Sequence, residues 1–275
     1  MRSASRSPSL AGAESKGRVR YAVLALCALG TAISPDAGAQ LLVDPLELTI
    51  NTTGSNPVSS GISLANKSDK PVQATITRSD WDRTEDGANR FLPAGSTAKS
   101  CGAALSVSPA SVRLEAHSSR IVRLTVQADT TLSRECWDIV FIEEVPQRSQ
   151  LVKGNSLDYI FRTGVKVYVA PAGLPSDAAI EQMAVVEAPR RQIAIRFHNT
   201  GATHLVTRGR LEFRRIDNTV AREISIADFP TLPGAVRKVL IDVPRDLTPG
   251  VYIALVLLDY GGTELLAGQI DYKAK

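Results

Sequence analysis

The chain has 275 residues, a length that suggests one or two domains. Its 44% hydrophobic and 22% charged residues are ordinary for a globular protein and exclude a collagen-like, low-complexity or wholly disordered chain. Five of the 32 Lys and Arg residues and two of the 28 Asp and Glu residues precede residue 40, which leaves the remainder with a formal charge of +1. A nearly neutral body gives no electrostatic basis for binding nucleic acid.

Residues 1–39 have the organisation of a secretory signal peptide. The basic residues end at Arg20, residues 21–33 (YAVLALCALGTAI) form an apolar run of 13 residues, and residues 37–39 (AGA) offer a cleavage site. A membrane anchor is the alternative, but such a run rises only about 20 Å as a helix, less than the roughly 30 Å hydrocarbon core. Cys27 could indicate a lipoprotein, but Leu26 stands before it where a small residue is expected. The sequence predicts export and no stable membrane insertion.

Export with cleavage leaves two cysteines, Cys101 and Cys136. An even pair in an oxidising compartment predicts one disulfide between them. The alternative is two buried free thiols. The pair makes a poor zinc site because no histidine lies nearby, so no metal is expected.

Short apolar or alternating runs recur through the first half of the mature chain. Strands are expected at residues 41–50, 58–65, 71–80, 104–108, 111–115, 120–127, 136–145 and 157–170. Turn-forming residues separate them, such as those at 51–54 (NTTG) and 66–69 (NKSD). Strands at this spacing without helical segments favour an antiparallel sandwich.

Residues 171–177 (PAGLPSD) read as a linker, and a second set of strands follows it. These strands are expected at residues 180–187, 191–198, 204–216, 222–226, 236–243, 250–259 and 264–272. We therefore predict an all-β fold of two immunoglobulin-like β-sandwich domains arranged around a cleft. The first domain spans residues 40–172 and the second residues 173–275, after the signal peptide at 1–39.

The sequence offers no residues for catalysis. It has no G-x-S-x-G, no phosphate-binding glycine loop and no H-E-x-x-H. Glu143 and Glu144 are adjacent, but a strand points them to opposite faces, so they cannot act as an acid–base pair. Each histidine, including His204, is interpreted as solvated or structurally bonded. We predict that the protein is not an enzyme and has no cofactor.

Leu157, Tyr159 and Phe161 alternate along the last expected strand of the first domain, so a strand places all three on one face. A polar segment, residues 147–156, precedes them. A large apolar face on an edge strand either binds a partner or packs into its own sandwich. The pattern alone leaves both open.

Three stretches of the first domain together resemble the periplasmic chaperones of pilus assembly, the PapD-like family. They are residues 61–72 (GISLANKSDKPV), residues 106–146 with SPASVRLE and RECW, and residues 157–171 (LDYIFRTGVKVYVAP). The resemblance implies a periplasmic chaperone that binds pilus, fimbria-type or other exported β-rich subunits by donor-strand complementation, with an outer-membrane usher as a further partner. The alternative is an exported structural or adhesive Ig-like protein, or a secretion-system accessory, because a fold does not imply a function.

The resemblance also implies site residues. The row Leu157, Tyr159 and Phe161 would be the strand lent to the subunit. Lys166 matches the family lysine that holds the subunit's terminal carboxylate, while Glu47 stands where the partner arginine is expected and would weaken such a site. A solvated or locally paired lysine is the alternative.

A second set of residues matches a buried ionic network that the family has at its domain junction. Arg123 and Glu135 match two of its members, so the resemblance implies a structural ion pair between them. Ala170 stands where a second arginine is expected.

Overall fold

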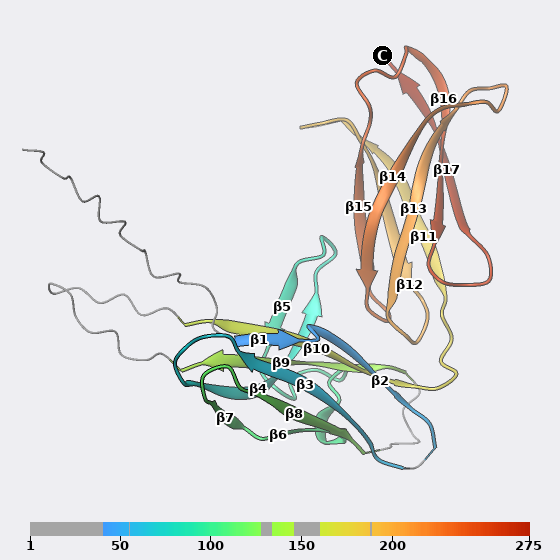
Figure 1. Cartoon of the computed structure of the whole chain (residues 1–275). Coiled ribbons are helices and arrows are strands. Elements are labelled where there is room, and N and C mark those ends of the chain that lie inside the picture. The colour runs from blue at the N-terminus through green and yellow to red at the C-terminus, as the bar shows by residue number, and fades with distance from the viewer. Residues whose placement is uncertain (1–40, 55, 128–133, 146–159, 188) are drawn as a thin grey trace, which may run out of the picture. The chain divides into compact units, whose positions relative to one another are not determined.

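The computed structural model describes residues 41–54, 56–127, 134–145, 160–187 and 189–275, and strands dominate them (Figure 1). The predicted signal peptide lies outside these residues. The described part of the chain contains one short 3-10 helix, Gly102–Ala104. Within that same part, no helix has the length and apolar character needed to cross a membrane.

Ten strands form the first sandwich. They are β1 (Leu41–Asp44), β2 (Glu47–Thr52), β3 (Val58–Asn66), β4 (Val72–Arg83), β5 (Asn89–Leu92), β6 (Leu105–Ser108), β7 (Ser111–Leu114), β8 (Ser119–Val126), β9 (Cys136–Glu144) and β10 (Arg162–Pro171). One sheet has the order β1-β3-β8-β6. The other has the order β2-β10-β9-β4-β5, with β7 paired to β4.

Seven strands form the second sandwich. They are β11 (Ala178–Val186), β12 (Gln192–Asn199), β13 (Leu205–Arg214), β14 (Val220–Thr231), β15 (Val236–Asp242), β16 (Gly250–Asp259) and β17 (Leu266–Ala274). Its sheets have the orders β11-β12-β15 and β14-β13-β16-β17. The all-β fold of two immunoglobulin-like sandwiches is therefore confirmed.

Each sandwich has its own apolar core, because alternate residues of a strand point to the same side. In the first, Val122, Leu124 and Val126 of β8 are fully buried in a cluster that includes alternate residues of β3 and β10. In the second, Ile193, Ile195 and Phe197 of β12 are buried in a cluster that includes residues of β13 and β16. The alternation visible in the sequence thus determines which side of these strands is buried.

The strand expected at residues 41–50 is wrong as a single element. The structure divides it at Pro45: β1 pairs with β3 in one sheet, and β2 pairs with β10 in the other. Proline has no backbone N–H to donate to a ladder, so it suits the point where the chain leaves one sheet for the other. This change of sheet places Glu47 beside β10.

Strand β9 is buried on both faces, unlike the half-exposed strand of a simple sandwich. Val140 and Ile142 point into the first core. On the other face, Trp137, Ile139 and Phe141 join a separate cluster with Trp81, Tyr168 and Leu232. Trp137 donates its ring N–H to the carbonyl of Trp81 at 2.9 Å. The site described below lies on β10, next to this strand.

Candidate functional site

Strand β10 is paired on one side along most of its length and on the other side from its middle onward. It pairs antiparallel with β9 from Arg162 to Val169. On the other side it pairs parallel with β2, beginning at Lys166. The segment from Arg162 to Val165 is thus an open sheet edge in the described part of the chain.

The hydrogen bonds show which backbone groups face this open edge. Glu144 donates its N–H to the carbonyl of Phe161 at 2.9 Å, so odd-numbered residues of β10 bond to β9. Lys166 donates its N–H to the carbonyl of Leu46 at 3.0 Å, so even-numbered residues face the other way. Since hydrogen-bonding direction alternates along a strand, the N–H and C=O groups of Arg162 and Gly164 point to the open edge. They are placed to pair with an added strand.

The structure covers the predicted binding row only in part. Leu157 and Tyr159 lie outside the described residues, and β10 begins at Arg162 instead of residue 157. Phe161 comes directly before β10 and is half-buried. Its parity is that of Val165 and the other core-facing residues of the strand. That the row binds a partner stays a prediction.

Gly164 marks a close approach of side chains and not a change of register. The pairing of β10 with β9 runs without a shift through this position. A Cβ at Gly164 would lie 2.7 Å from Cδ1 of Ile139 and 3.1 Å from Cε1 of Phe141. Arg162, two residues earlier, places its guanidinium 3.6 Å from the centre of the Phe141 ring. Because the register does not shift, Lys166, five residues after Phe161, lies on the opposite face of the strand from it.

Lys166 and Glu47 occupy opposite positions in the parallel β2–β10 pair. The Nζ of Lys166 lies 3.3 Å from Oε2 of Glu47 and 5.4 Å from the centre of the Trp81 ring. The lysine side chain is 24% exposed and the glutamate side chain 46%, so solvent reaches both charges. Lys166 is thus locally paired, and Glu47 occupies the neighbouring position that the resemblance assigned to an arginine.

The expected ion pair between Arg123 and Glu135 is wrong. Arg123 lies on an exposed position of β8, between Val122 and Leu124, which point into the core. Glu135 is completely buried and accepts hydrogen bonds from Thr203 Oγ1 at 2.8 Å and from the backbone N–H of His204 at 2.6 Å. The parity of Arg123 along β8 directs its side chain away from the core. Arg123 is therefore exposed, whereas Glu135 is buried.

His204 completes the surroundings of Glu135. Its Nδ1 lies 2.6 Å from Oε1 of Glu135, and its ring stacks on that of Tyr168 with centres 4.0 Å apart. Burial, followed by the charge of Glu47, raises the pKa of the Tyr168 hydroxyl, which keeps it neutral. From the sequence, His204 is expected only to be solvated or structurally bonded, because nothing in its sequence position reveals a partner 69 residues away.

The predicted disulfide is confirmed. Cys101 and Cys136 are bonded, with Cα atoms 5.0 Å apart. Asp138 lies beside this bridge and accepts hydrogen bonds from Ser100 Oγ at 2.8 Å and from the N–H of Cys101 at 3.3 Å. Burial raises the pKa of the Asp138 carboxyl, while these bonds and the charge of Arg78 oppose the rise. The bridge fixes the segment before β6 against the start of β9.

The geometry thus gives a candidate binding edge. Within the described residues, no group of three or more His, Cys, Asp or Glu side chains could hold a metal ion. Strand β10 offers an open edge at Arg162–Val165 and, one residue further, a lysine paired with a glutamate. The open edge suits recognition of an extended chain, while Glu47 opposes the binding of a carboxylate at Lys166.

Comparison with known proteins assigns the first sandwich to a family. Residues 47–175 match the family described as pili and flagellar-assembly chaperone, PapD N-terminal domain. The first sandwich of this chain therefore belongs to the PapD-like chaperone family. The comparison with curated protein sequences found no match.

Solved structures extend the likeness of fold to both sandwiches. The class 5 fimbriae chaperone CfaA is similar with a TM-score of 0.52 and 15% identity, over 83% of this chain and 98% of that chain. A chaperone–tip adhesin complex of CFA/I fimbriae biogenesis contains a chain that is similar with a TM-score of 0.51 and 14% identity, over 84% and 98%. At such identities the likeness shows a shared two-domain fold.

Proposed function

We propose that this protein is a periplasmic chaperone that binds pilus- or fimbria-type subunits by donor-strand complementation. A subunit that lacks one strand of its own sandwich would pair with the open edge of β10. Main-chain hydrogen bonds would supply affinity and alternate side chains would supply specificity, as in other cases of strand addition. Membership of the PapD-like family supports this function.

The observation that carries the proposal is the open edge at Arg162–Val165. An edge strand presents unpaired N–H and C=O groups, which is a hazard unless another chain covers it. Here the pairing of β10 with β2 begins only at Lys166, so the backbone groups of Arg162 and Gly164 remain for a partner. The row Leu157, Tyr159 and Phe161, which precedes this edge, would fill the groove of the subunit.

A periplasmic site of action and an outer-membrane usher as second partner belong to the same proposal. The predicted signal peptide at residues 1–39 supports export, and we infer that the domains divide at 172/173, between β10 and β11. The family is one of chaperones, so we also infer that the protein is not an enzyme. A structural or adhesive role would leave the open edge without a subunit to bind.

The test compares Arg162→Pro with Arg162→Ala. Both variants lose the exposed ion pair of Arg162 with Glu143 and the stacking on Phe141. Only proline removes the N–H that faces the open edge, and it leaves the bonds to β9 in place. Each variant is co-expressed with an exported, β-rich subunit encoded beside the chaperone gene, and the soluble subunit that co-purifies from the periplasm is measured.

We expect Arg162→Ala to retain the subunit and Arg162→Pro to lose most of it, with similar thermal unfolding of the two variants. Equal recovery with both variants would contradict strand addition at this edge. If the wild-type protein fails to recover any such subunit, the structural or adhesive alternative is favoured.

A further inference from the structure

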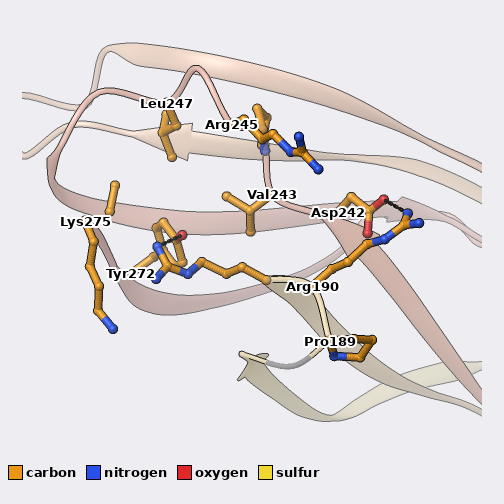
Figure 2. Close-up of a pocket in the computed structure, with 11 residues that line it drawn as sticks. Pro189, Arg190, Asp242, Val243, Arg245, Leu247, Tyr272 and Lys275 are labelled. Atoms are coloured by element: carbon orange, nitrogen blue, oxygen red, sulfur yellow. Dashed lines mark hydrogen bonds and ion pairs between the residues drawn. The ribbon is translucent and has the colours of Figure 1, made fainter.

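A basic pocket lies at one end of the second sandwich, and the chaperone function does not use it. Three segments line it: residues 189–191 between β11 and β12, residues from the end of β15 at Asp242 to Leu247, and the end of β17 with Lys275 (Figure 2). Its volume is about 550 Å³, within the roughly 300–1,000 Å³ range of small-molecule sites. It is thus large enough for a compact organic molecule.

Cations outnumber anions in the lining. Arg190, Arg191, Arg245 and Lys275 contribute basic side chains, and Asp242 contributes a carboxylate. That carboxylate is already engaged, because Gln192 Nε2 donates to its Oδ1 at 2.7 Å and Arg190 lies 3.5 Å from its Oδ2. Arg191 is also paired, with Glu187 at 3.1 Å, which leaves Arg245 as the lining guanidinium without an ion pair in the described part of the chain.

Arg191 is held in place within the pocket. Its Nε donates to Glu187 Oε2 at 3.1 Å and its NH1 donates to the hydroxyl of Tyr272 at 3.3 Å. Tyr272 is itself buried. A guanidinium has five N–H donors, so three remain after these two bonds. A fixed guanidinium with unused donors loses little conformational entropy when it binds an oxyanion.

Arg245 supplies a second guanidinium that is available for binding. No ion pair or hydrogen bond joins Arg245 to another residue in the described part of the chain, and the residue is exposed. Lys275 lines the opposite side of the pocket in Figure 2. The cations thus surround the space and do not form a row along a strand.

The rest of the lining is apolar. Val243 and Leu247 pack against the second core from the loop after β15, and the ring of Tyr272 adjoins them. Pro189, Pro244 and Ala274 complete this surface. An apolar wall beside guanidinium groups favours a ligand that carries a charged head on an apolar body.

We propose that this pocket binds an organic oxyanion, a carboxylate or phosphate group attached to an aromatic or aliphatic body. The oxyanion would accept paired hydrogen bonds from Arg245, the geometry that a guanidinium offers to such groups, and the unused donors of Arg191 belong to the same lining. The body would lie on Val243 and Leu247, which are partly exposed. This inference concerns the second sandwich alone and is independent of the subunit-binding function.

Binding to the purified protein is measured by calorimetry with four probes: phenyl phosphate, 3-phenylpropanoate, 3-phenylpropanol and inorganic phosphate. We expect one or both aromatic oxyanions to bind at least about tenfold more tightly than the neutral alcohol and than inorganic phosphate, a difference of about 1.4 kcal/mol. Arg245→Gln should weaken that binding by about tenfold or more, since it removes a charged donor that has no structural partner.

Arg208→Gln is the matched control. It removes the same charge from the same sandwich but at the other end of β16. Arg208 is paired with Asp259 at the last residue of β16, whereas the pocket residue Ala274 is paired with Gly250 at its first. Its affinity for the probes should equal that of the wild type. Absence of oxyanion binding, equal binding of the neutral alcohol or of inorganic phosphate, or equal effects of Arg245→Gln and Arg208→Gln would each overturn the proposal.

Discussion

Lys166 and Glu47 lie directly opposite each other in the only parallel strand pair of the described sheets, with Nζ 3.3 Å from Oε2. The pairing has two consequences for a carboxylate ligand. The lysine charge is already partly neutralised, and the glutamate would repel the ligand. A ligand carboxylate at Lys166 would therefore compete with Glu47 for the lysine charge.

We predict that the two residues have opposite effects on subunit binding. Lys166→Ala should weaken the affinity for a cognate subunit by roughly tenfold or more, because a charged hydrogen bond contributes about 1.5–3 kcal/mol. Glu47→Gln should strengthen it, because the repulsion is removed and the lysine is released. Both variants should unfold within about 1 kcal/mol of the wild type, as expected for an exposed pair.

Titration of the purified chaperone with a subunit, followed by calorimetry, measures both effects. Lys67→Ala, in the exposed turn after β3, serves as the control for loss of a lysine charge. Equal affinities for all the variants would remove Lys166 as an anchor.

The row Leu157, Tyr159 and Phe161 gives a second prediction, which rests on the sequence. Tyr159→Glu should abolish subunit capture and leave thermal unfolding unchanged, whereas Tyr159→Phe should retain capture. If the row packed into its own sandwich, the glutamate would be a buried, unpaired charge and would cost about 2 kcal/mol or more. Thermal unfolding of the free protein distinguishes the two cases.

The contacts of Glu135 give a third prediction. Its buried carboxylate accepts bonds from Thr203 and from both the backbone and the ring of His204. Glu135→Gln should therefore reduce the free energy of unfolding by about 1.5–3 kcal/mol, since an amide cannot accept all of these bonds. Glu143→Gln, which loses only an exposed pair with Arg162, should change it by less than about 1 kcal/mol. Denaturant unfolding measures both, and similar losses would contradict a special role for Glu135.

Glu212 of β13 gives a prediction about pH. Its buried carboxylate lies 2.7 Å from Nε of Arg210 and 2.6 Å from NH2 of Arg214. The hydrogen bond from Arg210 lowers the pKa of Glu212, burial opposes this, and Arg214 adds to the lowering. Because the pKa of Glu212 is lower in the folded state than in the unfolded state, its contribution to stability is complete at pH values above the ordinary pKa of glutamate. It is lost as the pH falls through the folded-state pKa.

We therefore expect Glu212→Gln to be less stable than the wild type near neutral pH, with the difference narrowing on acidification. Denaturant unfolding at about pH 7 and about pH 3 measures the two differences. Glu223 is a more exposed partner of Arg210, so Glu223→Gln should differ little from the wild type in free energy of unfolding at both pH values. A gap between Glu212→Gln and the wild type that stays constant with pH would contradict the argument.

The arginines of β13 show which ion pairs cannot be predicted from the sequence of a strand. Arg208, Arg210 and Arg214 alternate along β13, and Arg208 lies exposed beside Asp259. Arg210 and Arg214 instead bind the buried Glu212 between them. Charge patterns along one strand do not show which carboxylate the neighbouring strands will bury.

The sequence by itself determined the alternation of each strand, the disulfide partners and the family of the first sandwich. Side-chain direction in a strand depends only on parity, and two cysteines in an exported chain have one possible partner each. The tertiary structure alone decided that Pro45 divides a strand between two sheets, that Glu47 meets Lys166, and that Glu135 binds His204 instead of Arg123. These contacts join residues 69 to 119 positions apart, so they depend on strand order and register, which no local pattern specifies.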